Sequence, residues 1–321
     1  MVGNQSINEF KSNFNKIFHS TVLPALRPLD KERIKARKIS SIIGLSVSII
    51  ASIVVIFLCK DDMGLTSGNW ISIIFNCCFA IAIVTSIVMF LTKQFAKKNF
   101  ENSLKSKIMP IALNAFGDFK WTTNAIISIY ELKDSKIISH FENMDVDDNF
   151  IGSYKNVPIN ISEMHLYYKT RDSKGRQQTH TAFRGVVIKL EIPKHFKSHT
   201  IVVPKALINS GPYDEVKLED PEFSKKFHVR SNDQVEARYL LTTTFMERFK
   251  NIQSVFEAKT ISCSFLNNTL LMAIPVRKDL FSLGDLSKPV TDTKQYEVFL
   301  NELISIFELI EELKLYNNTG L

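Results

Sequence analysis

The sequence lacks the local motifs that mark common catalytic and cofactor sites. It contains no G-x-S-x-G nucleophile elbow, no phosphate-binding Walker loop, no dinucleotide fingerprint and no H-E-x-x-H zinc motif. A site assembled from residues far apart in the chain leaves no local signal, so these absences do not exclude an enzyme. They favour a protein that is not an enzyme, and they predict no cofactor and no bound metal.

Cysteine is scarce and irregularly placed. The four cysteines, at positions 59, 77, 78 and 263, form no C-x-x-C pair and no regular spacing. This pattern excludes a disulfide framework and a zinc ribbon. Cys263 lies in an apolar strand pattern, so we expect a small buried hydrophobe there and not a nucleophile.

Charge is missing from two long stretches near the N-terminus. Residues 39–59 are 21 consecutive residues without a charge, and residues 63–92 are 30 more. A helix of about 20 apolar residues crosses the hydrocarbon core of a bilayer. The first stretch lies too far from the N-terminus to be a signal peptide. The sequence therefore predicts a transmembrane hairpin over 39–92, with spans at about 39–59 and 70–92 and with Trp70 at an interface.

The basic residues that flank the spans predict the orientation of the hairpin. Residues 1–38 contain eight Lys or Arg and three acids, residues 93–107 contain five Lys and one Glu, and the link 60–69 contains one Lys and two Asp. Cytoplasmic flanks are enriched in Lys and Arg. We therefore expect a multi-pass protein of the bacterial inner (plasma) membrane with both termini in the cytoplasm.

The net charge of +7 is consistent with this location. A basic chain can bind nucleic acid, but much of the excess here lies beside the apolar stretches. That placement favours the anionic face of a membrane. We expect the lipid bilayer and anionic headgroups as partners, and no nucleic acid.

Helical patterns flank the two spans. Residues 1–38 predict an amphipathic helix and then a basic helix, with bends at Pro24 and Pro28. Residues 93–118 predict a stalk helix with a kink or break at Pro110. Either these segments pack together as an antiparallel stalk, or their apolar stripes lie on the bilayer surface.

Residues 119–321 predict a cytoplasmic α+β domain. Two hairpins are expected, with turns at Lys155-Asn156 and Asn267-Asn268, and further strands at 179–192, 199–204 and 225–230. A short helix is expected within 120–140 and a long amphipathic helix over 295–315. About seven strands with packed helices predict a mostly antiparallel sheet, and a partly open barrel is one way to arrange it.

Two groups of side chains resemble metal ligands. Asp145, Asp147 and Asp148 lie close together, but acidic residues before a strand more often form turns. His195 and His199 are four residues apart, yet the pattern around them predicts a loop and no third ligand is evident. Both groups therefore favour a structural role.

The densest mixed chemistry lies in the stretch "VRSNDQVEARYLLTTTFMERF", residues 229–249. Capping boxes starting at Ser231 and Thr244 predict two helical segments. Glu236 and Arg238 are then expected either to form a buried ion pair against the sheet or to bind a ligand or partner. An enzyme would need a dispersed site around Glu163, this pair and the histidines. His165 and His180 are expected to be surface or half-buried histidines, with a facing pair across neighbouring strands as the alternative.

A basic loop at 169–176 is the second candidate binding site. Lys169, Arg171, Lys174 and Arg176 surround Gly175. Four cations on a loop near a membrane favour contact with anionic headgroups, and a solvated hairpin loop is the alternative.

The segment "SNDQVEARYLLTTTFMERF", together with "DDNFIGSYKNVPINISEMHL", "FRGVVIKLEI", "FELIEELKL" and "FHSTVLPALRPLDKERIKARK", resembles an uncharacterised bacterial family of membrane-anchored proteins with a domain of unknown function. The family pattern D-x-x-E-A-R-Y-L-L-T-P is matched from Asp233 to Thr242, with Thr243 in place of proline. The resemblance implies a two-span anchor, a cytoplasmic α+β domain and a helix capped by Thr242. It implies no activity, and gene neighbourhood in the family implies a LemA-type membrane protein as partner.

These observations lead us to expect a membrane-anchored scaffold or binding protein that contacts proteins or lipid headgroups from the cytoplasmic side. Two alternatives stay open. One is a membrane-tethered hydrolase or transferase with a dispersed site, and the other is a bacterial effector inserted into a host membrane.

Overall fold

The computed structural model describes residues 7–58, 70–114, 118–192, 195–206, 213–277, 281 and 283–312. The chain divides into two compact units. The helical unit contains residues 18–109 and 282–293, and the sheet unit contains residues 1–17, 110–281 and 294–321. The link 60–69 and the side chain of Trp70, for which the sequence made predictions, lie outside the described residues.

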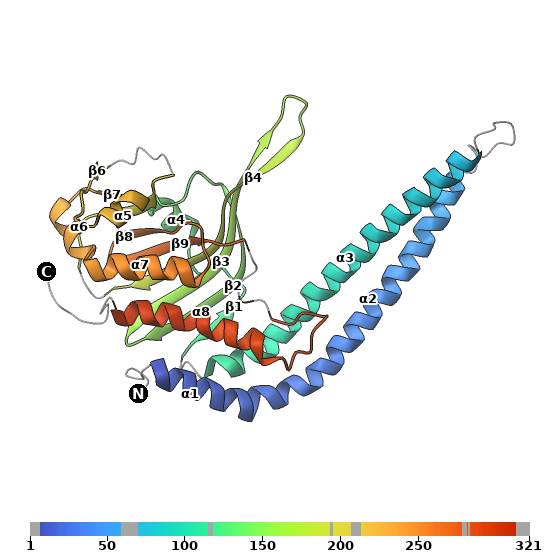
Figure 1. The fold of residues 1–321 in the computed structure, drawn as a ribbon, viewed down its shortest axis with the longest axis horizontal. Helices are drawn as coiled ribbons and strands as arrows, with labels where there is room; N and C mark the ends of the chain where they lie inside the picture. Colours follow the sequence, from blue (N-terminus) through green and yellow to red (C-terminus); the bar gives the residue numbers. More distant parts are fainter. Residues whose placement is uncertain are drawn as a thin grey trace. The chain divides into compact units, whose positions relative to one another are not determined.

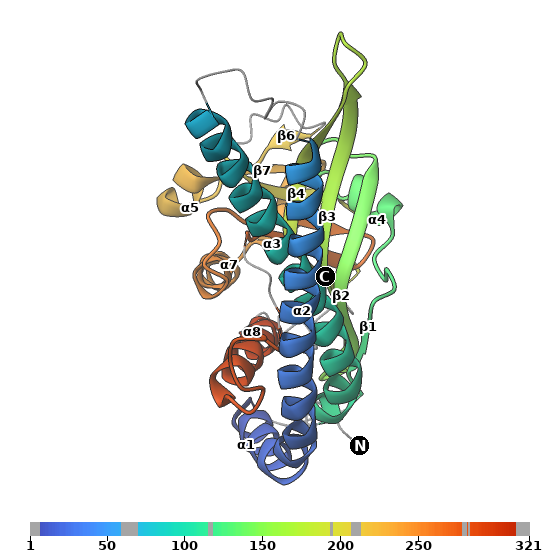
Figure 2. The same cartoon turned by 90° about the vertical axis from the view of Figure 1, so that its right-hand side faces the viewer.

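Two long helices build most of the helical unit. A π-helical turn, η1 (Phe18–Val22), leads into α2 (Leu23–Leu58), and α3 (Trp70–Leu113) returns beside it. Figures 1 and 2 both show α2 and α3 side by side as an antiparallel pair. Pro28 lies inside α2 and Pro110 inside α3, so both helices continue through these prolines and a break at Pro110 is excluded. A proline removes one helical hydrogen bond, and helices of this length continue past that local cost.

Both helices are long and apolar enough to cross a membrane, judged by length and composition. Their most apolar windows have mean hydropathies of 1.6 and 1.8, and only 17% and 0% of the residues in them are buried. Helices in the core of a soluble protein would have most of this surface covered. The exposed apolar surface is therefore the feature of α2 and α3 that needs an explanation.

The sheet unit is an α+β domain, as expected. Its nine strands are β1 (Lys120–Thr122), β2 (Asn143–Tyr154), β3 (Val157–Arg171), β4 (Gln177–Glu191), β5 (Thr200–Pro204), β6 (Asp214–Glu215), β7 (Phe227–Ser231), β8 (Ser262–Leu266) and β9 (Thr269–Pro275). Their order is β1-β2-β3-β4-β9-β8-β5-β7-β6, and every neighbouring pair is antiparallel. Because β1 and β6 end this order, the described sheet is open and is not a closed barrel.

Six helices accompany the sheet. They are α1 (Ile7–Ile17), α4 (Ile129–Asp134), α5 (Pro221–Lys226), α6 (Gln234–Leu240), α7 (Thr243–Val255) and α8 (Thr293–Glu312). The last of these confirms the expected C-terminal amphipathic helix within the described residues.

Both expected hairpin turns are present. Lys155 and Asn156 join β2 to β3 with φ of 49° and 63°, and Asn267 and Asn268 join β8 to β9 with φ of 50° and 59°. Two-residue turns with two positive φ angles match the twist of antiparallel strands. Asparagine tolerates this backbone region well, which explains why these turns could be predicted.

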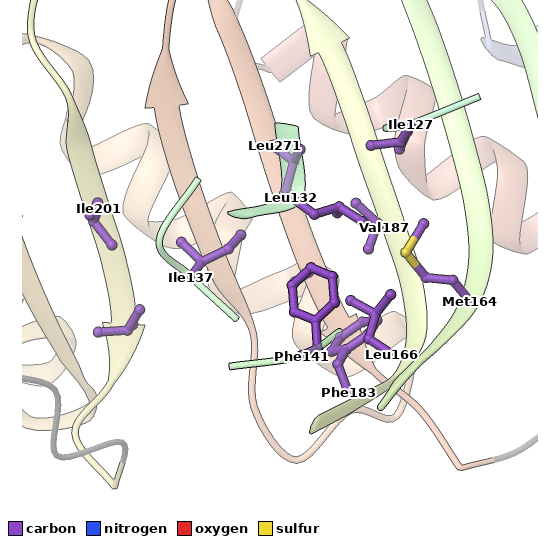
Figure 3. Close-up of a cluster of buried hydrophobic side chains, with 12 residues drawn as sticks. Ile127, Leu132, Ile137, Phe141, Met164, Leu166, Phe183, Val187, Ile201 and Leu271 are labelled. Atoms are coloured by element: carbon purple, nitrogen blue, oxygen red, sulfur yellow. The ribbon is translucent and has the colours of Figure 1, made fainter. Parts of the chain in front are cut away.

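The sheet is covered on both faces. One face carries a cluster in which Phe141, Leu166 and Phe183 gather below Leu132 of α4 (Figure 3). The other face carries α7 and α8, where Phe245 packs on Phe265 and Phe299 packs on Phe150. Buried side chains of this size each stabilise a fold by about 1.5–3 kcal/mol. The sheet is therefore a central layer between α4 and the pair α7 and α8.

Candidate functional site

A groove runs along α2 and α3 within the helical unit. It has a volume of about 710 Å³. The lining positions on each helix recur at spacings of one, three and four residues, which places them on one face of that helix. They are Glu32, Lys35, Ala36, Ile39, Ser40 and Ile43 from α2, and Leu91, Thr92, Phe95, Ala96, Asn99 and Phe100 from α3. We call this feature the α2–α3 groove.

Four small residues line the α2–α3 groove. Ala36 and Ser40 lie on α2, and Thr92 and Ala96 lie on α3. A Cβ atom added to Gly44 would lie 3.0 Å from Thr92 Oγ1, so there is no room for a larger residue beyond this end. Small side chains let two helix backbones approach and leave a trough between the larger residues beside them.

The hydroxyl groups in the groove donate to their own helices. Ser40 Oγ donates to the Arg37 carbonyl at 2.9 Å, and Thr92 Oγ1 lies 3.0 Å from the Val88 carbonyl. Their protons are therefore used inside the helices. The trough presents a largely apolar surface although two of its residues are polar.

Exposed apolar side chains flank the trough. Ile39 is 55% exposed, Leu91 58% and Phe95 72%. A contiguous apolar surface of this kind is unusual on a soluble monomer and marks contact with a membrane or a partner.

The polar end of the groove carries an uncompensated positive charge. Glu32 is engaged by Lys107 at 2.9 Å, which neutralises its carboxylate. Lys35 is exposed, and it has no ion-pair partner among the described residues. An exposed lysine beside an apolar trough favours a ligand with an anionic end.

The segment 283–290 packs on the same two helices. Arg33 donates to the Leu286 carbonyl at 2.8 Å and pairs with Asp30 at 2.8 Å, while Asp30 also accepts the Val290 amide at 3.1 Å. The Arg33 hydrogen bond holds the pKa of Asp30 below its usual range, against the opposing effect of burial.

A buried ion pair on α3 supports this contact. Glu101 accepts the Leu283 amide at 3.1 Å and pairs with Lys105 at 3.0 Å, and both side chains are almost fully buried. A buried charge needs such partners to offset its desolvation. The segment therefore bonds to both helices at their polar ends.

The structure separates Glu236 from Arg238. Glu236 accepts the backbone amides of Lys197 at 3.0 Å and Ser198 at 2.6 Å. Arg238 is exposed, and among the described residues its hydrogen bonds go to Gln234 alone, at 3.4–3.5 Å. The expected buried ion pair is wrong, because side chains that are two positions apart on a helix point in different directions. Glu236 instead holds the loop that precedes β5.

The helices α6 and α7 do not begin at the residues that the predicted capping boxes indicated. Asp233 caps α6 by accepting the amides of Val235 and Glu236, so the box at Ser231 is wrong. Thr242 caps α7 by accepting the Phe245 amide at 3.2 Å. This bond confirms the cap implied by the family resemblance and excludes the start at Thr244.

The basic loop joins β3 to β4 and is organised by one carboxylate. Asp172 accepts the amides of Lys174 and Arg176 at 2.9 Å and pairs with the Arg176 guanidinium at 2.8 Å. The Arg176 amide hydrogen bond is the main cause that lowers the pKa of Asp172. Lys169 lies over the Tyr167 ring, and Arg171 and Lys174 are exposed. The loop therefore presents its remaining cations to solvent.

The three aspartates that resemble metal ligands lie in β2, so the expectation that they form a turn is wrong. The pairing of β2 with β3 is irregular between Val146 and Asn149. Asp145 and Asp147 are exposed, whereas Asp148 is buried and accepts the Trp121 indole N–H at 2.6 Å. The described residues contain no cluster that could hold a metal ion.

The histidines of the sheet unit lie in separate places. His195 contacts Asn268 at 3.1 Å, whereas His199 is buried elsewhere. His165 lies opposite Arg184 in the sheet and His180 lies opposite Tyr168, so they do not form a facing pair. Both are half-buried, as expected.

Glu163 also lies away from the buried histidine. It follows Ser162 and precedes Met164, whose side chain lies in the α4-face cluster, so Glu163 projects to the other face. His199 bonds Ser264, which lies directly opposite Leu271 of that same cluster. The expected dispersed site is therefore not assembled from these residues.

A buried polar network on the α4 face was not expected from the sequence. His199 Nε2 lies 2.9 Å from Ser264 Oγ and 3.3 Å from the Ser135 carbonyl, and His199 Nδ1 lies 3.0 Å from the Tyr213 hydroxyl. Burial lowers the pKa of His199. A cavity of about 130 Å³ lined by Asp134, Ser135 and Ser264 adjoins it. No sequence signal identifies this network, because its members come from four separate segments.

Cys263 lies beside Ser264 and behaves as the sequence suggested. Its thiol is fully buried, and burial raises the pKa of that thiol well above its usual range. It is a small buried hydrophobe in β8.

Comparison with known proteins gives one family match. Residues 181–315 match the model of a family described as "Protein of unknown function (DUF3137)". No curated protein matches the sequence. A crystal structure of the mycobacterial trehalose monomycolate transport factor A, TtfA, aligns at 12% identity over 62% of this chain and 90% of that chain, with a TM-score of 0.36. The match from β4 to the end of the C-terminal helix confirms the resemblance to a family of unknown function.

Proposed function

We propose that this protein is a membrane-anchored binding protein or scaffold of the bacterial inner membrane. In this proposal α2 and α3 cross the bilayer as a hairpin, and both termini and the sheet unit lie in the cytoplasm. The basic residues flanking the two apolar stretches support this orientation.

The exposed apolar surface of α2 and α3 carries this proposal. Large apolar side chains are exposed along both helices. Burying each of them away from water is favourable by about 1.5–3 kcal/mol of free energy. A bilayer covers such a surface over its full length. The side chains are Ile39, Ile42, Ile43, Leu45, Val47, Ile49, Ile50, Ile53 and Val54 on α2 and Phe75, Phe79, Ile83, Ile87, Phe90, Leu91 and Phe95 on α3.

Alkaline carbonate extraction of membranes tests the anchor. The full chain is expected to stay in the membrane pellet. Replacing Ile50 and Ile83 together by lysine places one charge in each apolar helix. Each lysine raises the free energy of membrane insertion by about 2.5–3.5 kcal/mol, so the double variant is expected to be released from the pellet. Ile151→Lys changes an exposed isoleucine of the sheet unit and is the matched control that should stay in the pellet. Release of the unmodified chain would contradict the proposal.

The binding role is assigned to exposed residues of the sheet unit. Lys169, Arg171, Lys174 and Arg176 on the basic loop, with Arg238 on α6, are proposed to contact anionic headgroups or a membrane-protein partner, for which the family resemblance suggests the LemA type. Glu236 contributes by holding the loop before β5, since its carboxylate already accepts two amides.

Crosslinking in native membranes followed by pull-down tests this role. The unmodified chain should capture a membrane protein or bind anionic liposomes. Reversing the charge of the four basic loop residues should weaken that capture. Finding neither a partner nor liposome binding would contradict the proposed binding role.

A hydrolase or transferase is the second candidate function. The observation that favours it is the 2.9 Å contact between His199 Nε2 and Ser264 Oγ beside a cavity. It ranks second because Ser264 is 1% exposed and His199 also contacts the Ser135 carbonyl. A serine-directed phosphonate probe should label the chain, but not Ser264→Ala, if this candidate is correct.

A further inference from the structure

We propose that the α2–α3 groove binds one anionic phospholipid, with an acyl chain along Ile39, Ile43 and Phe95 and the phosphate at Lys35. The inference deepens the proposed function and rests on it, because a lipid reaches this groove only if α2 and α3 enter a bilayer. It adds a defined ligand site to what is otherwise an anchor.

The polarity of the groove changes along its length. Glu32 and Lys35 on α2 and Asn99 on α3 lie at one end, and Ile43 and Leu91 lie at the other. The two apolar stretches of the sequence begin at residue 39 and end at residue 92, so the expected edge of the hydrocarbon core crosses the groove. An occupant must therefore be apolar on the membrane side and polar on the water side, as a phospholipid is.

The charge at the polar end selects an anionic headgroup. Lys107 neutralises Glu32 at 2.9 Å, while Lys35 has no ion-pair partner in the described part of the chain. A zwitterionic headgroup would leave this excess charge uncompensated, whereas a net negative headgroup matches it.

The dimensions fit a single bound chain. The volume of about 710 Å³ lies within the roughly 300–1,000 Å³ typical of small-molecule sites. Ala36 and Ala96 keep the trough open from opposite helices, and Phe95 stands beside it. Filling the position of either alanine with an aromatic ring would close the site without changing the apolar rows that contact bulk lipid.

The experiment is native mass spectrometry of the full chain, extracted from membranes in a mild detergent and exchanged into fresh detergent. The unmodified chain is expected to retain one phospholipid per protein. After loading with equal amounts of phosphatidylglycerol and phosphatidylcholine, it should retain the anionic lipid preferentially. Ala96→Phe and, independently, Ala36→Phe should abolish retention. Gln94→Phe adds the same ring to an exposed residue that does not line the groove and should retain the lipid.

The headgroup contact is tested by charge reversal. Lys35→Glu should reduce the preference for phosphatidylglycerol by about fivefold or more, since one lysine near an anionic headgroup contributes about this factor. Lys38→Glu makes the same change in net charge three residues away and should leave the preference unchanged. Equal effects of the two variants would show a general surface charge and would overturn the site.

The remaining outcomes separate the two proposals. If carbonate extraction releases the unmodified chain, the anchor fails and the lipid site fails with it. If the chain stays in the membrane but Ala36→Phe and Ala96→Phe both retain lipid as the unmodified chain does, only the lipid site fails. The unmodified chain could instead retain no lipid and form a dimer that Ala36→Phe and Ala96→Phe abolish. That result would show that a second copy occupies the groove, and it would overturn the proposal.

Discussion

Gly185 in β4 occupies a backbone conformation that other residues cannot share at this place. Its φ is 152°, and an added Cβ would lie 2.1 Å from the Ile274 carbonyl oxygen and 2.6 Å from the Val276 amide nitrogen. Both atoms belong to the neighbouring backbone, which cannot move without opening the pairing of β4 with β9. Gly185→Ala is therefore expected to destabilise the sheet unit by roughly 2–4 kcal/mol in denaturant unfolding.

Gly175 supplies the control for this prediction. It also has a positive φ, 77°, but an added Cβ would meet no atom within 4 Å. Gly175→Ala should cost about 1–2 kcal/mol from backbone strain alone. Equal losses in the two variants would show that the close approach at Gly185 is unimportant.

His199 predicts a pH dependence of stability. Because burial lowers its pKa, the folded protein binds this proton less tightly than the unfolded chain does. Its contribution to stability is complete above the unfolded pKa of about 6.5 and falls as the pH drops from there toward the folded pKa. The unmodified chain should therefore lose thermal stability between about pH 7.5 and pH 5.5.

His199→Gln tests the origin of that loss. Glutamine keeps polar atoms near Tyr213 and Ser264 but cannot titrate. Its Tm should be lower at pH 7.5, because the fit to its partners is poorer, and should change less as the pH falls. The same pH slope in both proteins would contradict the assignment to His199.

At the scale of single elements, the start of α7 depends on one hydroxyl. Thr242 Oγ1 accepts the Phe245 amide at 3.2 Å, and α7 then places Phe245 and Phe249 in the core. Thr242→Ala should cost about 1 kcal/mol of unfolding free energy, and Thr242→Ser should restore most of it. Thr243→Ala, at the next and exposed position, is the control and should change stability little. If Thr243→Ala lowered the unfolding free energy as much as Thr242→Ala does, the assignment of Thr242 as the cap of α7 would be contradicted.

Elements with a local cause were predictable from the sequence. The turns at 155–156 and 267–268 contain Asn156, Asn267 and Asn268, and asparagine tolerates positive φ. The C-terminal helix follows from its apolar period. Short edge strands were not predictable. The strands β1 and β6 have three and two residues, and such lengths carry no period.

Side-chain partners were the least predictable feature. Glu236 and Arg238 suggested an ion pair because they are close in sequence, but Glu236 bonds the loop at 197–198, about forty residues earlier in the chain. The network around His199 draws on Ser135, Tyr213 and Ser264. Contacts over such separations depend on the completed sheet and leave no trace in local spacing.

At the scale of the whole molecule, the chain passes between the two units more than once. The segment 283–290 follows the sheet strands in sequence yet bonds Asp30, Arg33 and Glu101 on α2 and α3. The two long apolar helices were evident from the absence of charge, because a membrane span needs a continuous run of about 20 residues.

The central claim is that α2 and α3 cross the bilayer with the sheet unit in the cytoplasm. Labelling of single cysteines in intact cells with a membrane-impermeant maleimide tests it most directly, after the four native cysteines are replaced. Ser67→Cys lies in the link between the helices, and Lys174→Cys lies on the basic loop of the sheet unit. We expect Ser67→Cys to be labelled when only the outer membrane is permeabilised and the inner membrane is still closed. We expect Lys174→Cys to be labelled only after the inner membrane is opened as well. Labelling of Lys174→Cys from outside, or of neither residue until the inner membrane is opened, would contradict it.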